Sequence, residues 1–197
     1  YMLGASVSRL TSGFRTDLRY LARPFLESLS RETGETVCLN CARGTSRIVV
    51  DVIPASHEFS IIPAVGSALP IHIGASGKAL MAFFRPEDVE RILAECQQHP
   101  DSNEYGVSDV NDFNKGLRYA RRHGFAWSIG DVFPGSAAVA APVFDHTGNV
   151  AGSLTVRGPH VRLTRQRLIE LAPTVKKSAA SLSAALGYQS IPTRALG

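Results

Sequence analysis

The chain has 197 residues, 44% of them hydrophobic, so it can bury one substantial core and is too short for two large domains. Its net charge is only +4, and the basic residues are scattered along the chain, which argues against a large nucleic-acid footprint. No segment approaches the roughly 18 consecutive apolar residues of a membrane span, and no secretory signal opens the chain, so a cytoplasmic protein without a membrane partner is expected.

An amphipathic helix is predicted within residues 1–34. Apolar residues recur three or four apart from Leu10 to Leu29, and Gly34 supplies a C-terminal stop. Pro24 lies inside this pattern and predicts a kink or a break. Because the chain opens with Tyr1 instead of methionine, we expect it to be part of a longer protein.

A hairpin is predicted next, from "ETVCLNCAR" and "RIVVDVIPA" on either side of a Gly-Thr-Ser turn, followed by "EFSIIPAV" as a third strand or an irregular segment. Cys38 and Cys41 form a C-x-x-C pair within the first strand. Residues three apart on a strand point to opposite faces, so we expect reduced thiols and no shared metal or disulfide. The six histidines show no helical metal-binding spacing either, and no metal or cofactor is expected.

The segment "PIHIGASGKALMA" contains a run of small residues before a lysine. A phosphate-binding loop is excluded, because His72 replaces its first glycine and Ala79 its serine or threonine. A nucleophile elbow is excluded because Lys78 replaces its second glycine. Two interpretations remain: Ser76 is the N-cap of a helix "GKALMAFF" whose start accepts an anion, or the small residues pack that helix close to a sheet.

The second half of the chain predicts two helices, three strands and a final helix. The helices are "RPEDVERILAECQQH" and "DVNDFNKGLRYARRHG", and the strands are "FAWSIGD", "AAVAAPVFD" and "VAGSLTVRG". Thr164 is a good N-cap for the last helix, at 164–187, which contains Pro173. Strands and helices do not alternate regularly, so we predict an α+β fold with an antiparallel sheet and flanking helices.

The last strand predicts a ligand pocket. Its alternation places Val150, Gly152, Leu154 and Val156 on one face, and Ala151, Ser153, Thr155 and Arg157 on the other. The neighbouring strand is rich in alanine and leaves room above the sheet. Such a polar face is either an ordinary solvated surface or the wall of a pocket for a compact organic acid.

In the pocket interpretation, an arginine fork matches a carboxylate, so Arg157 would hold the acid together with the helix start at Ser76 and Gly77. Thr155 and Ser128 would orient it. The candidates for the apolar wall are Trp127, Ile61 and Leu69.

Several segments together resemble the effector-binding domain of the IclR family of bacterial transcription regulators. They are "LPIHIGASGKALMA", "RPEDVERIL", "RRHGFAWS", "AAVAAPVFDHTGNVAGSLTVRGP" and "LIELAPTVKKSAASLSAALG". The opening "YMLGASVSRL" is similar to the segment that follows the family's winged helix-turn-helix. The resemblance covers essentially the whole chain, and its specificity lies in the set of segments.

The resemblance implies a profilin-like or GAF-like α+β domain over residues 1–197 that binds a small organic or aromatic acid and assembles as a homodimer or homotetramer. DNA would be bound only by a winged helix-turn-helix domain outside this chain. The pocket positions that the resemblance implies are Ala75, Ser76, Ser128, Ala138, Thr155 and Arg157, with Ile61 and Leu69 as apolar cover.

This chain departs from the family pattern at Ser128, where an acid is common, and at Arg157, where a small hydroxyl residue is common. Both changes make the implied pocket more positive. A non-catalytic sensor domain is favoured because no residue is placed to activate Ser76, Lys78 or a histidine. The alternatives are a small-molecule enzyme and an assembly domain with a vestigial pocket.

Overall fold

A computed structural model of the chain describes residues 5–97 and 110–189. The helices are α1 (Ala5–Thr33), α2 (Gly74–Met81), α3 (Pro86–Gln97), α5 (Val110–His123) and α6 (Arg165–Ala185). The strands are β1 (Thr36–Arg43), β2 (Ser46–Ile53), β3 (Ala68–Pro70), β4 (Ala126–Ile129), β5 (Ser136–Phe144) and β6 (Val150–Pro159). The expected α+β architecture is confirmed.

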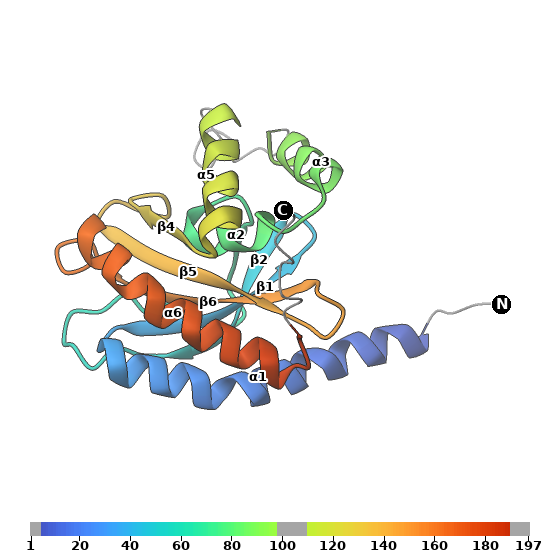
Figure 1. The fold of residues 1–197 in the computed structure, drawn as a ribbon, viewed down its shortest axis with the longest axis horizontal. Helices are drawn as coiled ribbons and strands as arrows, with labels where there is room; N and C mark the ends of the chain where they lie inside the picture. The colour runs from blue at the N-terminus through green and yellow to red at the C-terminus, as the bar shows by residue number, and fades with distance from the viewer. Residues whose placement is uncertain (1–4, 98–109, 190–197) are drawn as a thin grey trace, which may run out of the picture.

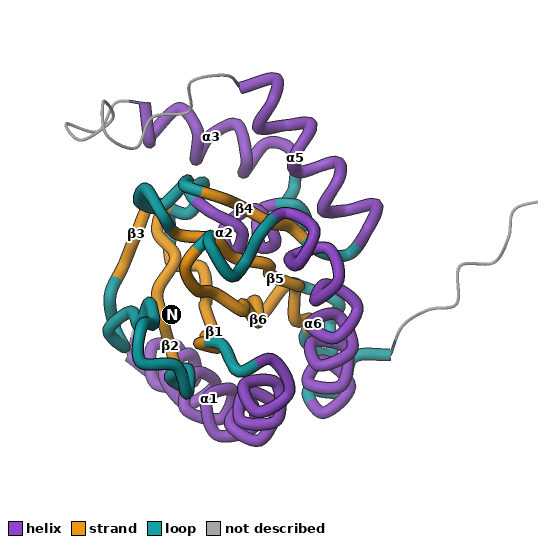
Figure 2. Tube along the Cα trace, turned by 90° about the vertical axis from the view of Figure 1, so that its left-hand side faces the viewer, coloured by secondary structure: helices purple, strands orange, loops and turns teal. Residues whose placement is uncertain are grey.

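One antiparallel sheet organises the molecule, in the order β3-β2-β1-β6-β5-β4. Helices α1 and α6 lie along one face of the sheet, and α2, α3 and α5 lie on the other side, as Figure 1 shows. The end-on view in Figure 2 shows the curved sheet between these two groups of helices. No helix in the described ranges is long and apolar enough to cross a membrane.

Two separate apolar cores follow from the alternation of side chains along the strands. Alternate residues of β1, β5 and β6, among them Leu39, Val139 and Leu154, pack with α1 and α6 in one core. The second core joins α2, α3 and α5 to the other face through Ala126 and Ala140. Each face of the sheet therefore has its own layer of helices.

Strand β6 has the predicted apolar face and polar face, except that Val150 lies on the other face from the one predicted. Leu154 and Val156 are buried in the α1/α6 core, and Ser153 and Thr155 are buried on the opposite face. Val150 does not share the face of Leu154, because it packs against the core on the α2 side. The register with β5 shifts between Val143 and Phe144, and this irregularity inverts the alternation at the start of β6.

The predicted ends of the first and last helices are confirmed. Of the kink or break expected at Pro24, the break is absent, because helix α1 is continuous through this exposed residue. Gly34 follows with a positive φ of 72°. At the other end of the fold, the Thr164 side chain accepts a hydrogen bond from the Arg167 backbone N–H and caps α6.

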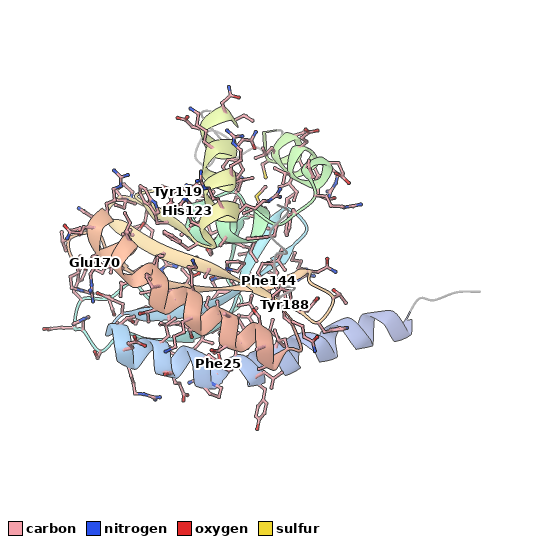
Figure 3. All side chains as sticks on the ribbon, in the orientation of Figure 1. Phe25, Tyr119, His123, Phe144, Glu170 and Tyr188 are labelled. Atoms are coloured by element: carbon pink, nitrogen blue, oxygen red, sulfur yellow. The ribbon has the colours of Figure 1, made fainter. Side chains whose placement is uncertain are left out.

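The segment between β2 and β3 is irregular for most of its length, and β3 is a short strand at residues 68–70. Beyond α6, the Tyr188 ring stacks on Phe144 with 5.0 Å between ring centroids. Figure 3 labels both residues near the end of α6. Phe83, which packs against the second core, meets the Phe144 ring edge-on. These rings connect the residue after the C-terminal end of α6 to that core.

Helix α2 begins earlier than the sequence predicts. Its N-cap is Ile73 and its first residue is Gly74, so Ser76 lies inside the first turn and is not the N-cap. Gly74 has a positive φ of 75°, which glycine adopts at little cost. A Cβ atom on Gly77 would lie 1.6 Å from the Ile71 carbonyl oxygen. The small residues therefore let α2 pack directly against the preceding backbone.

Replacing Gly77 by alanine should destabilise the fold, because the new methyl group would collide with a backbone oxygen that cannot move alone. We expect a loss of roughly 3 kcal/mol or more in the free energy of unfolding. Gly116→Ala is the matched control, because nothing lies within 4 Å of its added Cβ in α5. That change should stabilise by about 0.5–1 kcal/mol. Urea unfolding of both variants measures the difference, and equal effects would contradict this account of α2.

Candidate functional site

A small cavity lies between the start of α2, the polar face of the sheet and the segment 130–135 that joins β4 to β5. Strands β1, β2, β5 and β6 all contribute to its walls. The lining residues are Cys38, Asn40, Arg47, Ala75, Ser76, Ser128, Val132, Ser136, Ala137, Ala138, Thr155 and Arg157. Most of these side chains are small or polar, in contrast to the two apolar cores beside them.

A hydrogen-bond network crosses the sheet beneath this cavity. The Arg47 guanidinium, 3% exposed, donates from Nη1 to Asn40 Oδ1 and from Nε to the Ile73 carbonyl, both at 3.4 Å. Asn40 Nδ2 donates to Thr155 Oγ1 at 3.1 Å. The network thus links β2, β1 and β6, and it reaches the residue that precedes α2.

A second guanidinium enters the cavity from β6. Arg157 is partly buried, and loss of hydration lowers its pKa, while the adjacent Cys38 side chain acts in the opposite direction. Burial raises the pKa of the Cys38 thiol to about 11, despite the nearby arginines. At neutral pH this thiol is therefore protonated and supplies no negative charge to Arg157.

Neither guanidinium has an ionic partner among the described residues. The pKa of Arg47 is lowered to about 10, first by burial and then by repulsion from Arg157. The neighbouring acids pair elsewhere. Asp51 accepts from Arg23 at 3.1 Å, Glu35 from Arg162 at 2.7 Å, and Asp131 from Lys78 at 2.6 Å. Both arginines remain charged at neutral pH, so the cavity is strongly positive.

The start of α2 is tied to the opposite wall of the cavity. The Ala75 backbone N–H, which has no acceptor within the first turn of the helix, donates to Ser128 Oγ at 3.0 Å. Val132 lies against Gly74, since its Cγ2 is 3.0 Å from the position of a Cβ there. The Lys78–Asp131 ion pair holds the same segment against α2 from outside. These contacts close the cavity on the side away from the sheet.

The cavity is small and partly open to solvent. Its volume is about 20 Å³, which is room for one water molecule. A ligand here must be compact, and the walls must give way as it enters.

The structure brings six of the eleven predicted binding residues to this cavity: Ala75, Ser76, Ser128, Ala138, Thr155 and Arg157. Their contact with a ligand stays a prediction. The other five do not line it: Ile61, Leu69, Gly77, Trp127 and Ser153.

The positions of Trp127 and Leu69 in the sheet explain why these two residues do not line the cavity. Trp127 pairs with Val139 and packs against the α1/α6 core, with Arg165 5.3 Å above its ring, so it lies on the opposite face from Ser128. Leu69 pairs with Arg47 at the sheet edge but stops short of the cavity.

The remaining three have other positions in the fold. Ile61 lies in the irregular segment before β3, Gly77 packs against the Ile71 backbone, and Ser153 is fully buried between Asn40 and Pro142.

Six lining residues were not predicted: Cys38, Asn40, Arg47, Val132, Ser136 and Ala137. The sequence did contain a signal for Arg47. This charged residue lies inside the strand pattern "SRIVVDVI", at a position that alternation places on the same face as Val49. Cys38 and Asn40 share a face of β1, and that face could be identified only once β1 was paired with β6.

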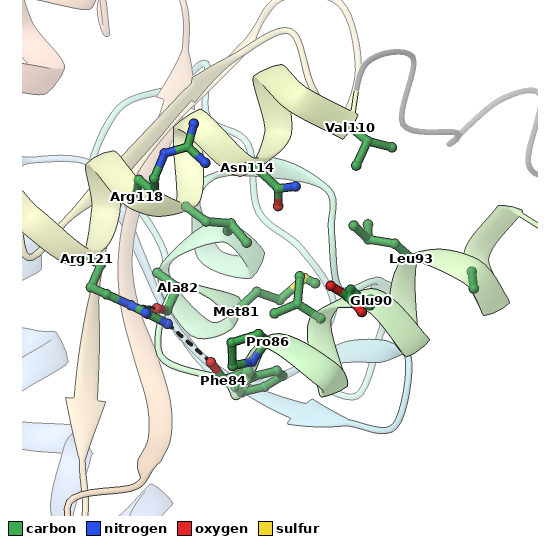
Figure 4. A pocket seen from close by; sticks show the side chains of 13 residues that line it. Met81, Ala82, Phe84, Pro86, Glu90, Leu93, Val110, Asn114, Arg118 and Arg121 are labelled. Atoms are coloured by element: carbon green, nitrogen blue, oxygen red, sulfur yellow. Dashed lines mark hydrogen bonds between the residues drawn. The ribbon is translucent and has the colours of Figure 1, made fainter.

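A larger cleft of about 470 Å³ lies between α3, α5 and the end of α2, as Figure 4 shows. Its walls are mainly apolar, and its polar lining residues are Glu90, Asn114, Arg118 and Arg121. Arg121 donates to the carbonyls of Ala82 and Phe84, at 2.6 and 3.2 Å, and so caps the end of α2. Converging polar groups mark the smaller cavity instead, and we take that cavity as the candidate site.

Residues 12–184 match the protein-family model described as bacterial transcriptional regulator IclR, C-terminal. The chain belongs to the IclR family. The transcriptional regulator KipR of Bacillus subtilis is 28% identical over 88% of this chain and 69% of its own length. The transcriptional regulator BhcR of Paracoccus denitrificans is 30% identical over 92% of this chain and 65% of its own.

Among solved structures, the C-terminal domain of the E. coli transcriptional regulator KdgR superposes with a TM-score of 0.74 at 27% identity. The match covers 87% of this chain and 99% of that domain. This chain spans about two thirds of the length of the two curated relatives, so it corresponds to the C-terminal part of such regulators. The expected family is confirmed.

The burial of Cys38 should make it unreactive in the folded protein. Its raised pKa means that this thiol favours folding below pH 9, and that contribution is lost as the pH rises through about 11. We expect iodoacetamide at pH 8 to label Cys96, which is partly exposed, well before Cys38. Mass spectrometry of the labelled peptides measures the order, with unfolded protein as the control. Equal labelling rates in the folded chain would contradict the burial of Cys38.

Proposed function

We propose that this chain is the effector-sensing domain of a DNA-binding transcription regulator, and that its effector is a small organic acid bound in the cavity at the start of α2. The observation that carries the proposal is the pair of guanidinium groups, Arg47 and Arg157, that line one cavity without an ionic partner among the described residues. A carboxylate matches an arginine fork in geometry and charge. Thr155 and Ser128 supply hydroxyl groups that would orient it.

A regulatory role is supported by the relatives, which are named as helix-turn-helix transcriptional regulators. In this proposal DNA is bound by a separate helix-turn-helix domain of the whole protein, and this chain contributes ligand sensing and assembly without catalysis. The modest net charge of +4 is consistent with a domain that does not itself bind DNA.

Self-association is supported by apolar side chains that the described fold leaves exposed. Tyr20 on α1 is 81% exposed, and Phe59 and Ile62, in the irregular segment before β3, are 68% and 53% exposed. Exposed apolar groups of this size favour contact with another surface. A two-fold assembly would also suit a regulator of palindromic DNA sites.

Replacing Arg157 by alanine should weaken acid binding by roughly 2 kcal/mol or more, because a hydrogen bond to a charged group contributes about 1.5–3 kcal/mol. Calorimetry with a panel of small organic acids measures the change for the best ligand. Arg122→Ala is the control, since it removes the same charge from the exposed end of α5. Unchanged affinity in a folded Arg157→Ala variant would show that Arg157 does not anchor the ligand.

We expect the isolated chain to form dimers or tetramers in solution, through the apolar surface that its helices and the segment before β3 leave uncovered. Light scattering coupled to gel filtration gives the mass of the assembly. A monomer as the sole species at a protein concentration of tens of micromolar would contradict this expectation.

A further inference from the structure

The charge of the cavity wall can be counted residue by residue. Three of its lining side chains are ionisable: Cys38, Arg47 and Arg157. The buried Cys38 thiol is protonated at neutral pH, whereas both guanidinium groups are charged. The wall therefore carries two positive charges and no negative charge.

The two guanidinium groups reach the cavity from different strands. Arg157 lies on β6, where it pairs with Thr36 of β1, and Arg47 lies on β2, where it pairs with Ala42. Cys38 and Asn40 of β1 line the cavity beside them. The two charges are close enough that repulsion from Arg157 contributes to the lowered pKa of Arg47.

A ligand with one carboxylate would leave part of this charge uncompensated. Arg47 is 3% exposed, and its two hydrogen bonds, to Asn40 and Ile73, go to neutral oxygens at 3.4 Å, the long end of the range. A buried cation with only such partners is costly, because water is lost and no opposite charge replaces it. Complete compensation of both guanidinium groups therefore needs a second negative charge.

We propose that the effector is a compact dicarboxylate, with one carboxylate on Arg157 and the other on Arg47. This inference rests on the proposed function and specifies its ligand class. The small size of the cavity favours a short carbon chain between the two carboxylates. Arg47 then selects dicarboxylates over monocarboxylates, and Arg157 holds the carboxylate that both classes share.

The test compares acids that differ in one charge and little else. Oxalate, malonate and succinate are titrated calorimetrically into the chain beside their monoamides, in which an amide replaces one carboxylate. We expect the best dicarboxylate to bind at least roughly tenfold more tightly than its monoamide, because a charge-assisted hydrogen bond is lost. In Arg47→Gln this ratio should fall to about one, while the monoamide affinity stays close to that of the unaltered chain.

Two further variants separate selectivity from folding. Arg43→Gln removes a positive charge from the same hairpin at an exposed site and should keep the tenfold ratio. Arg47→Lys keeps the charge without the fork and should retain part of the ratio. The melting temperature without ligand should not fall in Arg47→Gln, because that change removes an uncompensated buried charge. A large fall with an unchanged ratio would make Arg47 a structural residue and overturn the inference.

The remaining outcomes distinguish the two proposals. If dicarboxylates and monoamides bind equally and both depend on Arg157, the acid-sensing function stands and the dicarboxylate inference fails. If none of the acids binds but inorganic phosphate binds with dependence on Arg47, the site takes a different dianion and both proposals fail as stated. If neither acids nor phosphate bind the folded chain, both are overturned.

Discussion

The central position of β6 is the constraint on which the rest of the structure depends. β6 is hydrogen-bonded to β1 on one side and to β5 on the other, so every residue in its middle is enclosed by neighbouring strands. Alternation then sends Leu154 and Val156 into the α1/α6 core and Thr155 and Arg157 toward α2. One strand thus stabilises the fold with one face and builds the candidate site with the other.

The charges around the site are arranged so that the acids point away from it. Asp51 on β2 pairs with Arg23 of α1, on the far side of the sheet from Arg47. Glu35 holds Arg162 with both carboxylate oxygens, at 2.7 and 3.0 Å. The cavity is left with cations and neutral hydrogen-bonding groups. This separation leaves the positive charge of Arg47 and Arg157 on the wall of the cavity.

The packing around the cavity must offset the destabilising effect of these two cations. Uncompensated buried guanidinium groups oppose folding, so the stability of the domain must come from the two apolar cores on either side of the sheet. The close contact of α2 with the Ile71 backbone belongs to this framework, because it fixes the start of the helix above Thr155 and Ser128. The framework around the cavity therefore holds although its two guanidinium groups have no ionic partner among the described residues.

Local patterns in the sequence determined most of the elements and the two-sided character of β6. Helical spacing, the Thr164 cap and the alternation of Ser153, Thr155 and Arg157 depend on residues close together in the chain, and each was predicted correctly. The same alternation separates Trp127 from Ser128, so one wall could not hold both. The prediction that Trp127 lines the same pocket as Ser128 was therefore avoidable, because the sequence alone places these neighbours on opposite faces of a strand.

The second cation of the site depended on tertiary structure. Arg47 is over a hundred residues from Arg157 in the sequence, and nothing local to either indicates that β1 places them along one cavity. The start of α2 at Gly74 also required the fold, because contact between Gly77 and the Ile71 backbone sets how the helix enters. Periodicity specifies which face a residue occupies, whereas strand order and helix docking decide which faces meet.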